Sequence, residues 1–175
     1  MSSSPPVIVT ERLTLKASEL SDFEDSVAMW SDSIVTQFVG GRPSTPEESW
    51  ARLLRSRGLW PLLGYGYWAV RETSTGQYVG EVGFADFHRE IEPSFHNQPE
   101  MGWVLAAWSH GQGFGTEAVT AALAWIDRAL APPRIPCIID PGNAASLALA
   151  RKTGFKVVTH TTYKDAPIML LERTR

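Results

Sequence analysis

Three glycines stand at alternate positions just before a segment with helical character: Gly111, Gly113 and Gly115. Glycine has no Cβ, so a backbone built from it can approach a bound group closely. The first N–H groups of a helix have no partner inside it, and the helix dipole is positive at that end. Such a turn can bind a phosphate, although the same glycines can equally serve tight strand-to-helix packing.

The spacing of this turn argues against two common nucleotide motifs. A P-loop places Lys and then Ser or Thr after its last glycine, whereas Thr116 and Glu117 follow Gly115. A dinucleotide fingerprint needs Gly-x-Gly-x-x-Gly and an acidic residue about 20 positions later. Here the glycines run Gly-x-Gly-x-Gly and Asp140 comes late. Any phosphate bound at this turn therefore belongs to a different class of ligand.

A second polar position opens another helix. Asn143 follows Asp-Pro-Gly and precedes an apolar helical run, which makes it a candidate N-cap. Ser146 then falls in the first turn of that helix. Both side chains come after a strand-like segment, so they are candidates for contact with a ligand as well as for capping.

Strand-like and helix-like segments alternate around these positions. Apolar alternation predicts strands over 7–16, 64–72, 78–86, 100–105 and 135–140, and near Val157 and Ile168. Apolar spacing of three and four predicts helices over 18–31, from Ser44 or Thr45 to about Gly58, over 115–130 and over 143–153. Residues 73–77 predict a hairpin turn, and the later strand–helix order predicts partly parallel pairing. The polar stretch 87–99 is a candidate substrate loop.

The composition fits one globular domain. The chain has 175 residues, 43% hydrophobic and 20% charged, so we expect a tail over 1–6 and one domain over 7–175. No apolar run approaches the ~20 residues of a membrane helix, which predicts a cytoplasmic protein without a membrane partner. A net charge of −3 argues against nucleic acid. Cys137 is the single cysteine, so we expect no internal disulfide and no metal.

Four segments carry a family resemblance: Thr10-Glu-Arg-Leu-Thr-Leu15, Glu100-Met-Gly-Trp103, Gly111-Gln-Gly-Phe-Gly-Thr-Glu-Ala118, and Asn143-Ala-Ala-Ser146 through Gly154-Phe155. In this order they resemble a Gcn5-related N-acetyltransferase (GNAT), in particular the ribosomal-protein N-terminal (RimJ/RimL-type) branch. The resemblance implies an α/β (α+β) fold with a single mixed, mostly antiparallel sheet. Its central parallel strand pair is splayed, and helices flank the sheet.

The resemblance also implies the cosubstrate, acetyl-coenzyme A, and the residues that bind it. The glycine turn would hold the pyrophosphate through His110, Gly111, Gln112, Gly113, Phe114, Gly115 and Thr116. Trp103, Val104 and Leu105 would lie along the pantetheine arm, with Val104 and Leu105 offering backbone groups. Asn143 and Ser146 would contact the coenzyme from the next helix. His110 departs from the family, which usually has Gln or Arg at that position.

Acetyl transfer to a primary amine needs a group that removes a proton, because amines of pKa ~10.4 or ~7.7 to 8.0 are largely charged at neutral pH. The resemblance makes Glu100 the candidate base, against the alternative of an ordinary exposed carboxylate at a strand end. Weaker candidates are Glu81, Asp86, His88 and His96. Backbone N–H groups of Val104 or Leu105 would stabilise the carbonyl oxygen as charge develops on it.

The leaving thiolate raises a further question, since Ala150 stands where many members of the family have a tyrosine acid. Ser146 is the candidate catalytic substitute. The sequence thus predicts direct transfer in a ternary complex to a protein N-terminus or a small-molecule amine. The alternative is a non-catalytic acyl-coenzyme A sensor or interaction module, which Ala150 favours.

Several other residues keep two interpretations. Cys137 lies among apolar neighbours, which favours direct transfer over an acetyl-cysteine route. Arg151 and Lys152 either neutralise coenzyme phosphates or favour a helix C-terminus. Four aromatic residues form either core or an acceptor pocket: Trp60, Tyr65, Tyr67 and Trp68. Family habit also makes a homodimer an expectation.

Overall fold

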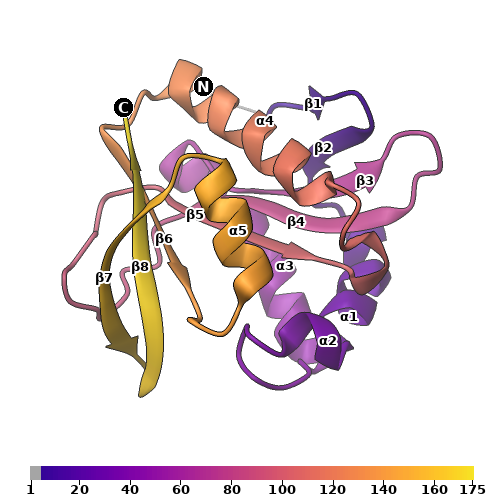
Figure 1. The fold of residues 1–175 in the computed structure, drawn as a ribbon. Helices are drawn as coiled ribbons and strands as arrows, with labels where there is room; N and C mark the ends of the chain where they lie inside the picture. Colours follow the sequence, from indigo (N-terminus) through magenta and orange to yellow (C-terminus); the bar gives the residue numbers. More distant parts are fainter. Residues whose placement is uncertain (1–4) are drawn as a thin grey trace.

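A computed structural model of the protein describes residues 5–175 and shows two antiparallel sheets (Figure 1). The first contains, in spatial order, β1 (Ile8–Val9), β2 (Leu13–Ala17), β3 (Tyr67–Glu72), β4 (Tyr78–Ala85) and β5 (Glu100–Leu105). The second has the order β6 (Arg134–Ile139), β8 (Ala166–Thr174) and β7 (Lys156–Tyr163). Within the described residues all strand pairs are antiparallel.

The two sheets meet where β5 lies beside β6 (Figure 1). No hydrogen-bonded ladder joins these two strands in residues 5–175. The expectation of parallel pairing within a single sheet is therefore wrong, although the splay between the strands is present. Because the strands are not paired, backbone groups on their facing edges are left for a ligand.

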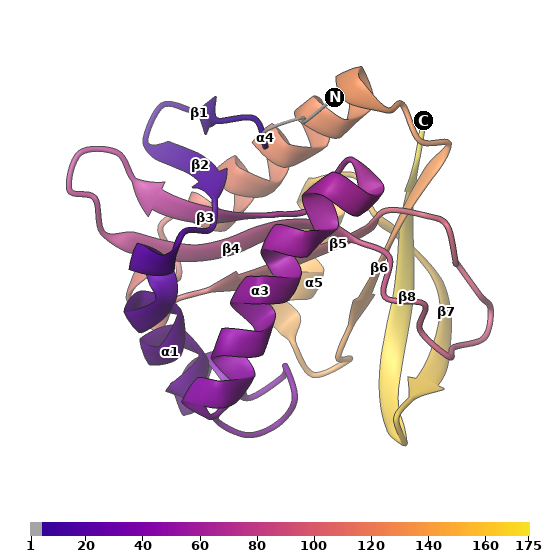
Figure 2. The same cartoon turned by 180° about the vertical axis from the view of Figure 1, so that it is seen from behind.

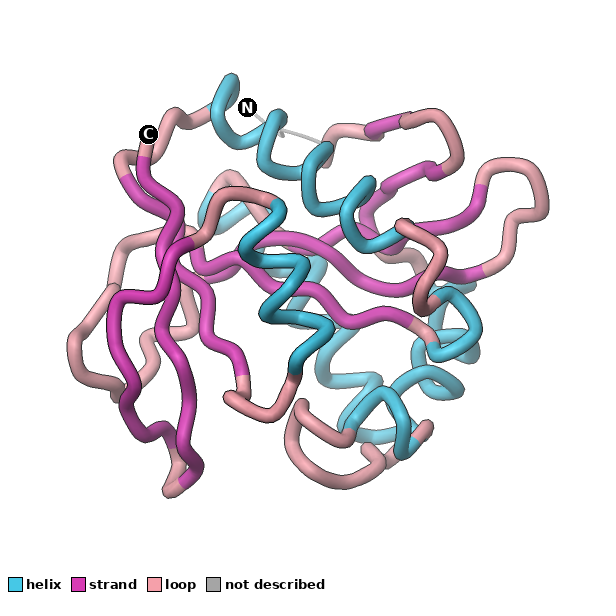
Figure 3. The backbone as a smooth tube through the Cα atoms, viewed as in Figure 1, coloured by secondary structure: helices cyan, strands magenta, loops and turns pink. Residues whose placement is uncertain are grey.

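Helices cover both faces of the first sheet. Helices α4 (Phe114–Ala129) and α5 (Ala144–Lys152) lie on one side, and both predicted boundaries hold to within one residue. On the other side lie α1 (Phe23–Ser31) and α3 (Pro46–Leu63), as Figure 2 shows, and the short α2 (Ser33–Thr36) follows α1. Two short 3₁₀ turns, Leu20–Asp22 and Ala107–Ser109, complete the regular structure (Figure 3).

The first predicted strand and helix are each divided. A turn closed by Thr10 N–H donating to the Leu13 carbonyl at 2.9 Å breaks residues 7–16 into β1 and β2, which pair with each other. Residues 18–31 begin with the 3₁₀ turn before α1 starts at Phe23. Polar side chains that bond nearby backbone compete with regular structure here, and the apolar spacing carries no sign of that competition.

Helix α3 runs five residues beyond its predicted end at Gly58. Its start is as expected: Thr45 accepts from the Glu48 N–H, the Glu48 carboxylate accepts from the Thr45 N–H, and Pro46 follows. The extension buries Leu59 and Trp60 against the sheet, and Trp60 donates to the Tyr67 carbonyl at 3.1 Å. Tertiary packing thus overrides a glycine inside the helix, and Gly64 in the left-handed conformation ends it.

Most of the apolar core lies between the first sheet and α4. Alternate residues of the strands are buried against that helix, including Leu15, Val70, Phe84 and Met101. Trp68 packs edge-on against Trp60 and Trp125, with ring centroids 4.8 Å and 5.2 Å apart. The opposite side of the same strands is more polar, and α3 spans it.

The expected N-terminal tail lies mostly outside the described residues. At its end, the Pro6 carbonyl accepts a hydrogen bond of 2.8 Å from Trp68. Among residues 5–175, no helix combines the length and apolar character that crossing a membrane requires.

Candidate active site

The glycine turn opens α4. Gly111 and Gly113 have φ values of 73° and 80°, a left-handed conformation that favours glycine, and Gly113 is the N-cap of the helix. The first hydrogen bond of the helix runs from the Glu117 N–H to the Gly113 carbonyl at 3.1 Å. The N–H groups of Phe114, Gly115 and Thr116 precede that bond and have no acceptor within the helix. The turn therefore fits an anionic group such as a pyrophosphate.

Arg12, in the turn just before β2, holds the glycine turn in place. Its guanidinium donates to the Gln112 carbonyl at 2.9 Å and to the Glu117 carboxylate at 2.7 Å. Thr10 also donates to Glu117, at 2.6 Å. Burial opposes ionisation of Glu117, but these hydrogen bonds lower its pKa overall. The sequence analysis gave Arg12 no role. The motif from Thr10 to Leu15 contains both residues that contact Glu117, so it could have indicated this role.

The other side chains of the turn mostly hold the turn itself. His110 Nε2 lies 2.9 Å from the Leu105 carbonyl, and Gln112 donates to the Trp108 carbonyl at 2.7 Å. Lys152 reaches the shallow hollow lined by Gly113 and Thr116, whereas Arg151 is exposed in the last turn of α5. Of these two basic residues, Lys152 is the one placed beside the turn.

The register of β5 decides which backbone groups face the gap toward β6. Ala106 N–H donates to the Val79 carbonyl, and the Val104 carbonyl lies where a side chain at Gly80 would stand, so both point to β4. Backbone groups alternate in direction along a strand, so those of Trp103 and Leu105 point to β6. The expectation that Val104 offers backbone groups there is therefore wrong, and Trp103 takes that place.

Asn143 and Ser146 lie together at the start of α5. The Asn143 side chain accepts from the Ser146 N–H at 3.0 Å, which confirms the N-cap. Ser146 Oγ in turn accepts from the Trp103 indole N–H at 3.2 Å, so the hydroxyl keeps its own proton to donate. Ala150 is fully buried in the core.

One cleft of about 680 Å³ joins these groups to the polar face of the first sheet. Trp103, Asn143 and Ser146 line its coenzyme side. Its other walls come from α3, β4, β8 and the loop after α2. An amine in this cleft therefore lies in the same cavity as the edge of β5.

Tyr67 forms the middle of the cleft floor. In the sheet register Tyr67 lies opposite Gly83, and Gly83 lies opposite Gly102, so the ring crosses two strands that lack side chains there. A Cβ on Gly102 would occupy the position of the Tyr67 hydroxyl. Of the four aromatic residues considered for an acceptor wall, only Tyr67 lines the cleft, because Trp60 and Trp68 are core residues.

Glu81 lies on the floor opposite Val104. Its Oε1 accepts from Ser26 at 3.0 Å and from Tyr78 at 3.1 Å, whereas Oε2 has one donor, the Trp30 indole N–H, at 3.4 Å. Burial raises the pKa of this carboxyl despite those hydrogen bonds. Glu81 thus keeps an oxygen with spare capacity to accept a proton.

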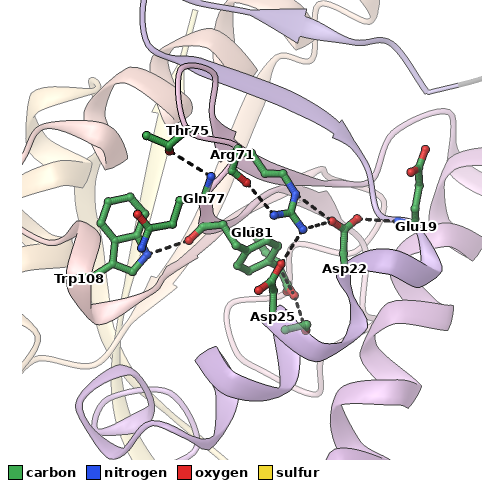
Figure 4. Close-up of polar contacts among 11 residues, drawn as sticks. Glu19, Asp22, Asp25, Arg71, Thr75, Gln77, Glu81 and Trp108 are labelled. Carbon is green, nitrogen blue, oxygen red and sulfur yellow. Dashed lines mark hydrogen bonds and ion pairs between the residues drawn. The ribbon is translucent and has the colours of Figure 1, made fainter.

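A charged network supports Glu81 from behind. The Arg71 guanidinium bonds Asp22 at 2.6 Å and Asp25 at 2.7 Å (Figure 4). It also lies 5.2 Å from the ring centroid of Tyr78, which donates to Glu81. The network ties the start of α1 to β3 and so fixes the far side of the cleft.

Glu100 is buried rather than exposed at its strand end. Both of its oxygens accept from Arg89, at 2.8 Å and 3.0 Å, and its side chain is 4% exposed. Burial raises the pKa of Glu100, and the Arg89 guanidinium opposes that rise. Each oxygen thus accepts one charge-assisted hydrogen bond from Arg89, which favours the charged carboxylate over a form that has taken up a substrate proton.

Sequence and structure comparisons identify the family. The acetyltransferase (GNAT) domain pattern matches residues 12–156, most of the chain. The chain belongs to the GNAT acetyltransferase family. It is similar to an uncharacterized N-acetyltransferase, p20, of Bacillus licheniformis, 27% identical over 150 residues that cover 85% of this chain and 82% of the relative.

Solved GNAT structures share the fold over the whole chain. A protein of Bordetella pertussis assigned to the GnaT family is 31% identical, with a TM-score of 0.85 over 97% of this chain and all of its own. An acetyltransferase of Agrobacterium tumefaciens has a TM-score of 0.84 at 23% identity, covering 100% and 98% of the two chains. The GNAT fold expected from the motifs is confirmed, and the chain is an acetyl-coenzyme A-dependent acyltransferase.

The other residues considered as the general base, Asp86, His88 and His96, belong to the loop after β4 or to its start. The Asp86 carboxylate accepts from the N–H groups of His88 and Asn97, so it shapes the loop. His88 and His96 are exposed, and their ring centroids lie 5.1 Å apart. That loop packs Ile91 and Phe95 against β8, which gives it a core as well as a place beside the cleft.

The thiol of Cys137 is buried, and burial raises its pKa well above the usual range. A thiol held neutral is a poor nucleophile, which favours direct transfer. Residues 5–175 contain no cluster of three metal-ligating side chains of the His, Cys, Asp and Glu types.

Proposed function

We propose that this GNAT chain moves an acetyl group directly from acetyl-coenzyme A to a primary amine bound in the same cleft. The observation that carries the proposal is the continuity of that cleft: Trp103 and Ser146 line one side, and Glu81 lines the other. The amine nitrogen forms a bond to the acetyl carbon, and the bond from carbon to sulfur breaks. The amine loses a proton and the departing sulfur gains one.

The chain would hold the coenzyme mainly through its backbone. The free N–H groups at the start of α4 suit the pyrophosphate, with Lys152 close by. The edge of β5 at Trp103 and Leu105 suits the pantetheine arm, and Asn143 and Ser146 suit its far end. These residues would orient the acetyl carbonyl toward the floor of the cleft.

Glu81 is the carboxylate we assign as general base, in place of Glu100. Glu81 has an oxygen with one long hydrogen bond, whereas each oxygen of Glu100 is held by Arg89. A base must have a free lone pair within reach of the proton that it removes. Burial raises the pKa of Glu81, which makes this carboxylate a stronger base than an exposed one.

Two groups of the coenzyme side would complete the reaction. The backbone N–H of Trp103 faces the gap between β5 and β6. It can donate a hydrogen bond to the acetyl carbonyl oxygen as negative charge develops there. The Ser146 hydroxyl can give its proton to the sulfur and recover one from solvent. A thiolate of pKa near 8.5 leaves readily, so the absence of a tyrosine at Ala150 is compatible with turnover.

Distant relatives support an amine as the general kind of acceptor, but not which amine it is. A spermidine N-acetyltransferase of Vibrio cholerae, solved with CoA and spermine, shares the fold with a TM-score of 0.72 at 16% identity. A second Vibrio cholerae protein, described as a ribosomal-protein-serine acetyltransferase, shares the fold with a TM-score of 0.77 at 22% identity. With the four motifs, the second likeness supports the RimJ/RimL-type branch as part of the proposal.

The test is thiol release from acetyl-coenzyme A across peptides with free N-termini, amino acids, polyamines and aminoglycosides. The assay is run above the α-amine pKa of ~8, so that deprotonation does not limit the rate. Release above the blank without acceptor, matched by acetylated product, is the expected result. Coenzyme binding without release by any amine would overturn the proposal in favour of the non-catalytic sensor.

A further inference from the structure

Arg52 of α3 lies in the cleft without a partner for one of its nitrogens. Its Nη1 is buried and has no hydrogen-bond partner among residues 5–175. The guanidinium stacks on the Trp30 ring, 3.8 Å from the centroid, so its position is set by packing. Burial lowers the pKa of Arg52, which is the mark of a cation with incomplete compensation.

The charges of the cleft are unbalanced at this point. Arg89 is paired with Glu100, whereas no carboxylate of residues 5–175 lies within ion-pair distance of Arg52 or Arg55. Arg55 stacks on Phe87 at 5.0 Å, one turn further along α3. Positions three residues apart share a helix face, so both guanidinium groups face the same cavity.

Glu81 lies close enough to Arg52 to raise its pKa by direct charge interaction, yet the two form no salt bridge. The cleft is thus lined by a carboxylate whose Oε2 accepts one long hydrogen bond and by an arginine that has no ion-pair partner among residues 5–175. That pair is complementary to a molecule that carries an amine and a carboxylate a short distance apart. A guanidinium can hold a carboxylate through two parallel hydrogen bonds.

We propose that the acceptor amine carries a carboxylate near its nitrogen, as an α-amino acid does, and that Arg52 binds this carboxylate while Glu81 faces the amine. This inference rests on the proposed acetyl transfer and names its substrate class. A polyamine or an aminoglycoside would bring further positive charge close to Arg52 and Arg55. A dianionic phosphate would lie against Glu81, so a single carboxylate fits better.

The test compares matched acceptors: a set of α-amino acids and their primary carboxamides, which keep the amine and the side chain but lose the charge. We expect kcat/KM to be about tenfold to a hundredfold higher for the acids. For both members of a pair, KM is expressed as the concentration of the neutral amine. Equal values for each pair, or higher values for the carboxamides or for spermine, would overturn the inference. Such results would leave the acetyl transfer itself established.

Variants assign the preference to Arg52. In Arg52→Gln the ratio of acid to carboxamide should fall to about one, while kcat/KM for the carboxamides changes little. The matched control is Arg57→Gln, which removes an exposed arginine of the same helix. A ratio that stays high in Arg52→Gln would contradict the assignment. Thiol release by neither acids nor carboxamides, with the coenzyme bound, would instead count against acetyl transfer.

Discussion

The two ends of the cleft are built in different ways. The coenzyme end relies mainly on backbone: the edge of β5 at Trp103, which lines the cleft beside Asn143 and Ser146, and, outside the cleft lining, the N–H groups at the start of α4. The acceptor end consists of side chains, chiefly Arg52, Tyr67 and Glu81, from the three successive elements α3, β3 and β4. Acetyltransferases that share one cosubstrate can bind it with the same backbone arrangement. The side chains at the acceptor end can differ from one enzyme to another, to suit different acceptors. The comparison predicts that variants at each end affect different kinetic constants.

The largest effect is expected at the acceptor end, from Glu81→Gln. The amide cannot take up the amine proton, so kcat at pH 7 should fall about 10²-fold to 10⁴-fold. Steady-state kinetics with a saturating acceptor check this value. The matched control is Glu47→Gln, an exposed carboxylate of α3, which should retain wild-type kcat. A loss below about threefold in Glu81→Gln would remove Glu81 from the mechanism.

The pH profile sharpens the same assignment. Glu81 must be ionised to act as a base, and burial raises the pKa of this carboxyl above its usual range. The acid limb of kcat should therefore lie at higher pH than an exposed glutamate would give, with activity lost as the pH falls through the raised pKa. In Glu81→Gln this limb should disappear, and the residual rate should rise with pH as the free amine accumulates. An unchanged acid limb in that variant would assign the titration to another group.

The second effect concerns stability rather than turnover. In Glu100→Leu, Arg89 is left without its partner, which should lower the free energy of unfolding by about 3 to 5 kcal/mol. Urea unfolding measures this change. The double variant Arg89→Met/Glu100→Leu should recover most of the loss, because no unpaired buried charge remains. A near-neutral Glu100→Leu whose kcat fell a thousandfold would return the base role to Glu100.

A smaller effect is expected at the coenzyme end, from Gly113→Ala. The left-handed conformation costs a residue with a Cβ about 1 to 2 kcal/mol, so the turn should open and the Kd for acetyl-coenzyme A should rise about fivefold to thirtyfold. Calorimetric titration checks this value. Gly76→Ala carries similar backbone strain in the distant hairpin turn, where φ is 75°, and should leave the Kd unchanged. Equal shifts in both variants would indicate a general loss of stability.

The smallest effect is expected from Ser146→Ala, which removes one neutral hydrogen bond. The kcat should fall about twofold to tenfold. Slow thioacetyl donors with more basic thiols should be affected more than acetyl-coenzyme A, since they need the proton more. Ser74→Ala in the exposed hairpin turn is the control. An identical loss for all donors would assign Ser146 to orienting Trp103 instead.

Sequence reasoning was most successful where function depends on contiguous backbone. The glycine turn, the Asn143 cap and the two helices that they open follow from local rules, and the structure confirms all four features. The bracing of the turn by Arg12 was missed, because residues 12 and 117 meet only through the fold.

The acceptor end could not be predicted in the same way. Glu100 matched a motif, but its pairing with Arg89 depends on how an irregular loop folds back over β5. Glu81 gained its place from burial under α1 and α3, and Arg52 from stacking on Trp30. The backbone groups that face β6 belong to Trp103 and not to Val104, because of the register between β4 and β5. The residue types in β5 do not specify that register.

The most direct test measures two quantities on one preparation of Glu81→Gln: the Kd for acetyl-coenzyme A and the single-turnover rate of acetyl transfer. If the two ends of the cleft are separate, the Kd should stay within about twofold of the wild type while the transfer rate falls about a hundredfold or more. A Kd that rose in step with the lost rate would contradict this account. So would a single-turnover rate equal to that of the wild type.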